Sequence, residues 1–471
     1  MKRRGAAGTL LLPAGDLILV VLAFVLGYWL RHYALADPLD RLLGIPGDFR
    51  LDILQYIISG TVMGIIEVVM LQAFGVYQRE YGLAQIEELA WILRSSFMAV
   101  VITFAFTFAT RQLLFSRFVL LFAFPAASLS VALWHWIFHR MSRRIALKRG
   151  RGIRVAVYGS GVLASELASF MEKRASVPYE IAGFPEASEG DDPPEKAAAV
   201  REWMRSGEVS ELVIADPNLP REEVSALVYM CEHEGFSYKL AADVFDLVSM
   251  TARVVHMGGT TMVESVPPPL EGGRRMMKRV LDLAVSIPMA IILFPIGLVV
   301  AAAVVLETGF PVFYSQTRLG RGNRPFRMLK FRSMRVGAHD RRLELEGANE
   351  ASGPLFKIRD DPRVTGVGRF IRKWSIDELP QLYNVITGSM SLVGPRPPLR
   401  EEVEDYTERH LKRLQTIPGI TGVWQVSGRS NLSFSEMIKL DLYYVDNWSI
   451  WMDISILILT VPAVLVRKGA Y

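Results

Sequence analysis

The sequence predicts a membrane α-helical bundle, then a Rossmann-like α/β domain, and finally a second α/β domain that contains a re-entrant membrane helix. Three observations predict this order. The first 140 residues contain four long apolar segments, a strand–glycine loop–helix pattern follows them, and a proline-containing apolar segment lies in the second half of the chain. A chain of 471 residues is also longer than one hydrophobic core usually supports, so several separately packed regions are expected.

Composition narrows the class of protein. Apolar residues make up 51% of the chain, and the mean hydropathy of +0.25 is high for a soluble protein but too low for one that lies wholly in lipid. The formal net charge is +5, yet the basic residues flank apolar stretches and do not interleave with aromatics, which argues against nucleic-acid binding. Cys231 is the only cysteine, which excludes an intrachain disulfide and a CxxC site. We expect the working domains to lie in the cytosol.

Residues 1–140 are predicted to form a four-helix transmembrane bundle. Each apolar segment is long enough to cross a hydrocarbon core of about 30 Å. Basic residues precede the first segment and follow the fourth, so the positive-inside rule places both ends in the cytoplasm. A cleaved signal peptide is the alternative for the first segment, which is longer than a usual signal-peptide core of about 7 to 15 residues. The segments are Leu10–Leu30, Ile53–Phe74, Trp91–Thr110 and Leu114–Phe138.

Residues 152–262 are predicted to form the Rossmann-like α/β domain, and a proline-rich linker over 263–277 follows it. In this domain Gly159 and Gly161 are the candidates for cofactor binding, because they lie in a loop between a strand and a helix. The second strand of a dinucleotide site should end in an acidic residue, and the Gly-Phe-Pro-Glu sequence at 183–186 is a poor match. We therefore favour a regulatory or structural domain over catalytic use of NAD. Strands are expected at Arg154–Tyr158, Glu211–Ala215 and Ser237–Leu240.

Residues 278–471 form the last predicted domain, which begins with the apolar segment 281–306. This segment is long enough to span a membrane, but basic residues lie on both sides of it, so both flanks prefer the cytoplasmic face. A helix that enters the membrane, breaks at Pro295 and returns to the same face satisfies both flanks, and a simple fifth span is the alternative. The apolar stretch Ile450–Val466 is short for a span and is expected to pack in the core or along the membrane interface.

Asp377 and Glu378 are the candidate catalytic residues, because carboxylates, an amide and several arginines gather around them in the sequence. Ser375 and Glu378 also fit a helix-capping box, which is the structural interpretation of the same residues. The two interpretations are compatible, since a helix N-terminus that keeps Asp377 ionised also offers backbone N–H groups to a phosphate. Adjacent residues on a helix do not face each other, so one carboxylate could attack while the other positions metal or substrate.

Basic side chains supply the predicted phosphate ligands. Arg396 lies between two prolines that restrict its backbone, which suits a fork-shaped phosphate ligand. Arg318, Lys330 and Arg332 follow one another at roughly strand-like spacing and are candidates to bind a diphosphate or anionic lipid headgroups. The seven histidines show no HExxH pattern and no His/Cys cluster, which argues against a zinc site. The metal expected is Mg²⁺, held by Asp377 and a diphosphate.

A series of short motifs runs through the last domain. They are Lys278-Arg279 with Asp282, Gly309–Tyr314 with Arg318 and Gly320, Lys330–Met334, the Asp377-Glu378 window, Val393–Pro397, and Pro418–Gly422 with Trp424, Gln425, Gly428 and Arg429. With these motifs the segment resembles the catalytic region of the monotopic polyprenyl-phosphate phosphoglycosyl transferases, which begin capsule, exopolysaccharide and O-antigen assembly. Four spans and a Rossmann-like domain are similar to the large members of that family. Those enzymes often carry serine before the helix-breaking proline, where this chain has Phe294.

The resemblance implies an α/β monotopic catalytic domain on the cytoplasmic face of a bacterial inner membrane. Asp377 would attack the β-phosphate of a UDP-sugar, release UMP and form a phosphosugar-aspartyl intermediate. Undecaprenyl phosphate would then accept the phosphosugar, as the first membrane step of exopolysaccharide or lipopolysaccharide synthesis. Glu378 would position metal or acceptor, and Arg396 and Lys330 would bind phosphoryl oxygens. Membrane lipid is a further expected partner, and the bundle and the Rossmann-like domain offer surfaces for a homodimer.

Two functions from other classes compete with this one. A membrane-tethered NAD-dependent enzyme that modifies nucleotide-sugars would explain the glycine loop, but the chain contains no Tyr-x-x-x-Lys motif. A noncatalytic membrane scaffold would use its basic clusters to bind lipid alone. For such a scaffold, replacement of Asp377 would change nothing beyond stability.

Overall fold

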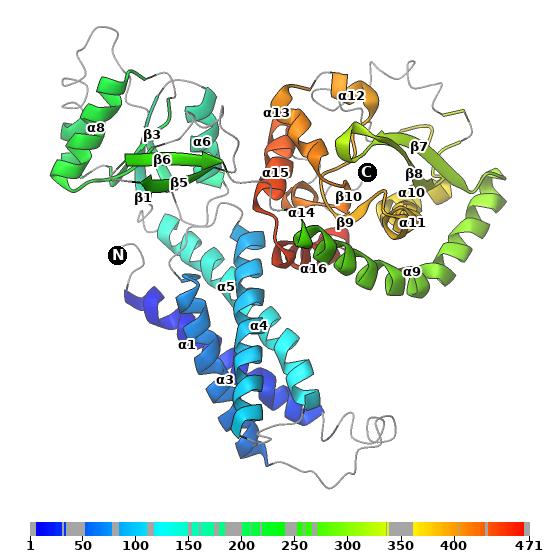
Figure 1. Ribbon diagram of the computed structural model, residues 1–471, viewed down its shortest axis with the longest axis horizontal. Helices are drawn as coiled ribbons and strands as arrows, with labels where there is room; N and C mark the ends of the chain where they lie inside the picture. Colours follow the sequence, from blue (N-terminus) through cyan, green and yellow to red (C-terminus); the bar gives the residue numbers. More distant parts are fainter. Residues whose placement is uncertain are drawn as a thin grey trace. The chain divides into compact units, whose positions relative to one another are not determined.

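The chain divides into two compact units, Met1–Leu247 and Val248–Tyr471. Figure 1 shows the computed structural model, in which the first unit holds a helical bundle and an α/β domain and the second holds the remaining α/β domain. The structure describes residues 6–30, 33, 52–77, 84–110, 117–148, 153–159, 162–173, 179–183, 200–207, 209–216, 219–240, 252–257, 260–265, 270, 272–335, 337–338, 361–404, 406–428 and 432–465.

The bundle contains α1 (Ala6–Trp29), α3 (Ile53–Ala73), α4 (Ala84–Thr110) and α5 (Arg117–Lys148). Buried apolar side chains from all four helices form its core. α1 and α3 approach closely because Gly60 and Gly64 leave room, and a Cβ atom on Gly64 would lie only 2.7 Å from Leu17 Cδ1. The core residues include Phe24, Leu71, Ile92 and Val131.

Three of the four predicted spans lie in helices that are long and apolar enough to cross a membrane, namely α1, α3 and α4. α5 contains most of the fourth predicted span and continues to Lys148, beyond the boundary at 140 predicted for the bundle. Its described part does not meet the same combined requirement of length and hydropathy. Large apolar side chains such as Leu22, Ile65 and Leu133 are exposed on the outside of the bundle, as lipid contact requires. The protein is therefore a membrane protein.

The α/β domain of the first unit contains a parallel sheet with the strand order β2-β1-β3-β4. The three predicted strands are confirmed as β1, β3 and β4, while β2 is an additional strand. Helices α6 and α8 pack with this sheet around buried apolar residues. The bounds are β1 (Ile153–Tyr158), α6 (Val162–Lys173), β2 (Tyr179–Gly183), β3 (Glu211–Ile214), α8 (Arg221–Glu234) and β4 (Ser237–Leu240). The antiparallel hairpin that follows in the chain, β5 (Ala252–Met257) and β6 (Thr260–Ser265), belongs to the second unit.

The second unit builds an α/β domain from short elements around the long helix α9 (Gly273–Thr308). β7 (Phe313–Leu319) and β8 (Pro325–Phe331) form an antiparallel pair, and β9 (Ser391–Val393) pairs in parallel with β10 (Gly419–Thr421). The other elements are η3 (Arg321–Asn323), α10 (Gly366–Lys373), η5 (Ile376–Glu378), α11 (Gln381–Thr387), α12 (Arg400–Glu404), α13 (Glu408–Leu411), η6 (Lys412–Gln415), α14 (Val423–Ser427), α15 (Phe434–Asn447) and α16 (Ile450–Leu465).

α9 begins before the predicted segment 281–306 and is one continuous helix through Pro288 and Pro295. We expected a break at Pro295, but the helix bends instead, and Figure 1 shows α9 as a wide arc along the outside of its unit. A proline removes one backbone hydrogen bond and crowds the preceding turn, which can kink a helix without ending it. Apolar side chains such as Ile292, Phe294 and Val299 are exposed on this arc.

Both ends of α9 are fixed to the same α/β domain. At the first end, Lys278 Nζ lies 2.8 Å from the fully buried Asp453 Oδ2 of α16. At the other end, the Arg332 guanidinium donates to the carbonyls of Thr308 and Gly309. The Glu307 carboxylate accepts from two backbone N–H groups in the first turn of α10, where the helix dipole favours a negative charge.

The apolar C-terminal stretch is helix α16, and its first half packs in the core, as predicted, with Met452 and Ile456 buried. Its second half exposes Val461 and Leu465. A separate cluster of Val300, Val304, Phe331 and Ile371 joins α9, β8 and α10. This cluster holds the strand that ends at Phe331 against the helix that precedes Asp377.

Candidate active site

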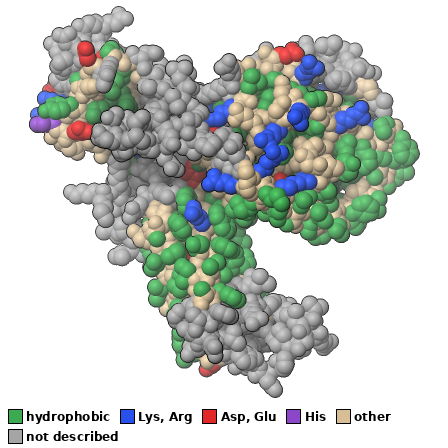
Figure 2. Space-filling model, in the orientation of Figure 1, with side chains coloured by type: hydrophobic (Ala, Val, Ile, Leu, Met, Phe, Trp, Pro, Cys, Tyr) green, Lys and Arg blue, Asp and Glu red, His purple; other side chains and the backbone are tan. Residues whose placement is uncertain are grey.

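A cavity of about 460 Å³ lies in the second unit and brings together segments that are far apart in the sequence. Seven of its lining residues are basic and two are acidic, so the cavity strongly favours an anionic ligand. Figure 2 shows Lys and Arg side chains gathered on this unit beside the hydrophobic rim formed by α9. The charged lining residues are Arg318, Lys330, Arg332, Arg335, Arg363, Arg372, Asp377, Arg396 and Glu402.

Asp377 lies in the short 3-10 helix η5, and its side chain is buried at the wall of this cavity. The chain enters η5 through Ser375, whose φ of 55° is left-handed and rare for a residue other than glycine. Ser375 makes no side-chain cap, so the expected capping box with Glu378 is wrong. The reason is local: the left-handed turn at Ser375 and the ion pair of Glu378 with Lys330 replace the capping geometry.

Lys330 connects the two candidate carboxylates. Its Nζ lies 2.6 Å from Glu378 Oε1 and 3.8 Å from Asp377 Oδ2. Lys330 is on β8, and the short antiparallel pair of β7 and β8 fixes its position opposite Tyr314. Asp377 and Lys330 line the cavity, whereas Glu378 does not, and the Glu378 side chain is about one third exposed. The neighbouring acids therefore have different surroundings, as separate roles require.

Burial raises the pKa of Asp377 to about 6. The positive charge of Lys330 acts in the opposite direction, and the nearby Glu378 carboxylate adds to the increase. At neutral pH the carboxylate is still mostly ionised. It combines a negative charge with incomplete solvation, which suits a nucleophile.

Arg396 is held by its backbone. Its N–H donates to the buried carboxylate of Asp441, and its carbonyl accepts from Arg413, which forms an ion pair with the same Asp441. The preceding Gly394 is needed for close packing, because a Cβ atom there would lie 2.6 Å from the Ile417 carbonyl oxygen. The Arg396 guanidinium lines the cavity and makes no hydrogen bond or ion pair with the described residues. It is available to a ligand.

The other two predicted phosphate ligands are partly engaged. Arg318 donates to the Pro397 carbonyl and to Gln316, and lies 3.7 Å from Glu402. Arg332 holds the end of α9 with one nitrogen, while its Nε and Nη1 atoms are buried without a partner among the described residues. Because unpaired buried donors are costly, these two N–H groups are well suited to an anion in the cavity that Arg332 lines.

The structure adds three arginines that were not among the predicted site residues, Arg335, Arg363 and Arg372. Arg363 is fixed by a two-pronged ion pair with Asp361. Arg372 lies on α10, a strongly amphipathic helix whose polar side could have been read from the sequence. Gly159, in contrast, lies at the end of β1 in the first unit, and Gly161 is outside the described residues.

The cavity can accommodate a hard cation only with help from a ligand. Asp377 and Glu402 are its lining carboxylates, and they belong to no group of three close ligands among the described residues. Mg²⁺ is commonly held by one or two carboxylates together with substrate phosphates, and this donor set fits that pattern. Asp377, with Glu378 beside it, is the place where such an ion would bind.

Comparison with known proteins identifies two regions. Residues 273–467 match the bacterial sugar transferase family, and residues 72–242 match a family described as a CoA-binding domain. The first region contains the whole cavity. The second combines part of the bundle with the parallel sheet of the first unit.

Several curated proteins are similar to this chain. The galactosyl transferase CpsE of Streptococcus agalactiae is 48% identical over 201 residues, which are 41% of this chain and 43% of that protein. The UDP-glucose:undecaprenyl-phosphate glucose-1-phosphate transferase of Escherichia coli is 34% identical over 57% of this chain and 58% of its own length. The exopolysaccharide production protein ExoY of Sinorhizobium fredii is 40% identical over 41% of this chain, and the match covers 88% of ExoY.

Proposed function

We propose the function of this chain from its family: it belongs to the bacterial sugar transferases, the polyprenyl-phosphate phosphoglycosyl transferase family. It transfers a sugar 1-phosphate from a UDP-sugar to undecaprenyl phosphate and releases UMP. Relatives named for galactose and glucose transfer make UDP-galactose and UDP-glucose the first donors to test. The reaction begins exopolysaccharide, capsule or O-antigen synthesis at the cytoplasmic face of a bacterial inner membrane.

One observation carries this proposal: a buried carboxylate lies in a cavity lined by seven basic side chains, next to an exposed apolar helix. The basic residues suit a nucleotide diphosphate, and the carboxylate suits attack on phosphorus. The apolar helix suits a lipid acceptor. A noncatalytic lipid-binding surface would not require Asp377 to be buried, and that burial is energetically unfavourable for a charge.

In the first step the Asp377 carboxylate attacks the β-phosphorus of the UDP-sugar. A bond forms between Asp377 oxygen and phosphorus, the bond from that phosphorus to the oxygen bridging the two phosphates breaks, and UMP leaves with the bond electrons. Arg396, Arg332 and Lys330 stabilise the charge on the phosphoryl oxygens. In the second step an oxygen of undecaprenyl phosphate attacks the same phosphorus, and the Asp377 carboxylate leaves unchanged.

α9 gives the reaction its location. Its apolar surface is exposed and both of its ends are fixed to one domain through Lys278 and Arg332, which supports a helix that enters and leaves the membrane on one side. A simple crossing would place the two ends on opposite faces of the bilayer. The cavity then lies at the headgroup level, where a soluble donor and a lipid phosphate can meet.

Mg²⁺ is the metal that suits this site. Asp377 and Glu378 would hold it together with the donor's diphosphate, and the ion would offset the negative charge of the diphosphate. Lys330 also reduces the negative charge at this site, because its ammonium group pairs with Glu378 and lies close to Asp377.

The test is UMP release by the purified full chain in lipid with Mg²⁺, undecaprenyl phosphate and a panel of UDP-sugars. We expect UMP with one donor, and its loss in Asp377→Asn. Glu404→Gln is a matched control, because this acid is exposed on α12 outside the cavity, and it should retain wild-type release. No UMP from any donor, or UDP in its place, would overturn the proposed reaction.

A further inference from the structure

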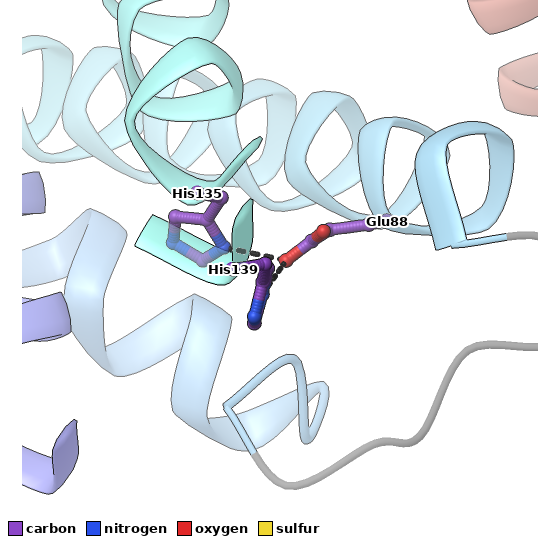
Figure 3. Close-up of side chains that lie close together, drawn as sticks. All are labelled: Glu88, His135 and His139. Carbon is purple, nitrogen blue, oxygen red and sulfur yellow. Dashed lines mark hydrogen bonds and ion pairs between the residues drawn. The ribbon is translucent and has the colours of Figure 1, made fainter. Parts of the chain in front are cut away.

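Three potential metal ligands meet inside the bundle, far from the cavity in sequence. Glu88 Oε1 of α4 lies 2.8 Å from His135 Nδ1 and 2.9 Å from His139 Nε2, both on α5 (Figure 3). His135 and His139 are four residues apart and therefore share one face of the helix. Their three ligand atoms all lie within 4.8 Å of one another. Ligands of a tetrahedral zinc ion are about 3.4 Å apart, so small side-chain movements would complete the geometry.

A second carboxylate supports this trio from α1. Asp16 Oδ2 lies 3.1 Å from His135 Nε2, and Tyr77 donates a hydrogen bond of 2.7 Å to the same oxygen. Metal-binding histidines usually donate their other ring N–H to a carboxylate, which fixes the tautomer. With Asp16 accepting from Nε2–H, the Nδ1 lone pair of His135 is directed at the position between Glu88 and His139. The outer partner that a metal-binding His135 needs is therefore present.

The charges in this cluster also favour a cation. Asp16 and His135 have no exposed side-chain surface, and only 8% of the Glu88 side chain is exposed. The other Asp16 oxygen, Oδ1, has no partner among the described residues. Two carboxylates in such surroundings are costly unless an equal positive charge accompanies them. A divalent ion bound to two neutral imidazoles would balance both.

We propose that Glu88, His135 and His139 bind a divalent metal ion, Zn²⁺ or one with similar ligand preferences. Two histidines and one carboxylate are a known ligand set for zinc, and the fourth position is left to water. The ion would cross-link α4 and α5, and Asp16 would tie α1 to the same site. The His139 side chain is 18% exposed, which provides a route for the ion to enter. This site is independent of the transferase reaction.

The test measures zinc bound to the full chain, purified in lipid nanodiscs without a polyhistidine tag and equilibrated with Zn²⁺ before removal of the free ion. We expect about one zinc ion per chain in the wild type, and almost none in His139→Gln or Glu88→Gln. His233→Gln is the control, since His233 is exposed on α8, and it should bind as the wild type does. Added Zn²⁺ should raise the melting temperature of the wild type but not that of His139→Gln.

His139→Gln keeps a hydrogen-bonding side chain of similar length, and a single gel-filtration peak would show that the variant remains folded. Equal zinc content in the wild type and both ligand variants would overturn the proposal, whether that content were high or zero. A melting temperature that does not respond to Zn²⁺ in the wild type would also overturn it, because the cluster would then be an ion-pair network alone.

Discussion

Asp377 shows at the scale of one residue how a reactive group can oppose stability. Its pKa is raised to about 6 in the folded chain, above the ordinary value of 3.8, because burial disfavours the charged form. The folded state therefore releases this proton less readily than the unfolded state. The resulting loss of folding stability is absent below pH 4, grows as the pH rises from 4 to 6, and is constant above that range.

Replacing Asp377 by Asn should therefore stabilise the protein while it abolishes UMP release. Above pH 7 we expect the free energy of unfolding of the second unit to rise by up to about 3 kcal/mol, because a pKa increase of about two units is relieved. Thermal unfolding of both proteins at pH 8 and pH 4 measures the difference, which should shrink at pH 4. A variant less stable than the wild type at pH 8 would contradict this prediction.

At the scale of elements, α9 depends on a buried ion pair. Lys278 of α9 lies 2.8 Å from Asp453 Oδ2, and the Tyr444 hydroxyl and Trp448 indole donate to the same carboxylate. Lys278 also lies 3.8 Å from Asp282 Oδ1, which accepts from Ser391. This network joins the start of α9 to α15, α16 and β9.

Lys278→Met should destabilise the second unit by about 3 to 5 kcal/mol, because it leaves Asp453 buried without its cation. Arg274→Met at the exposed start of α9 is the matched control and should melt as the wild type does. Thermal unfolding of the three proteins measures the effect. The double variant Lys278→Met with Asp453→Leu should recover part of the loss, and no loss in Lys278→Met would show that the pair does not anchor α9.

At the scale of the whole molecule, the candidate active site lies within one of the two units. The match to ExoY of Sinorhizobium fredii covers 88% of that protein and only 41% of this chain. A protein of that family therefore consists almost entirely of the sugar transferase region. The first unit, with its bundle and parallel sheet, is an addition to that region.

A chain shortened to residues 248–471 should keep UMP release within about tenfold of the full chain, since a domain with its own core can fold alone. UMP release in lipid by the two chains at equal concentration measures this, with Asp377→Asn in the short chain as the blank. A folded but inactive short chain would show that the first unit takes part in the reaction.

Features that depend on neighbours along the chain could be predicted from the sequence alone. Apolar length predicted α1, α3, α4 and α9, and strand patterns predicted β1, β3 and β4. The Asp377-Glu378 window contains the carboxylate of Asp377, which the structure places at the cavity wall. Two predictions about local backbone geometry were nevertheless wrong. The left-handed Ser375 replaced the capping box, and α9 bent through Pro295 where a break was expected.

Which distant side chains meet became clear only from the packing of the folded chain. Arg372 joins Lys330 and Arg396 in one cavity, and the amphipathic pattern of α10 does not reveal that its polar side faces these two residues. Glu88 meets His135 and His139, whose spacing on α5 is visible in the sequence while their third partner is not. The physical reason is that hydrophobic periodicity and motifs act over a few residues, whereas burial, ion pairing and pKa depend on packing between elements that are tens of residues apart.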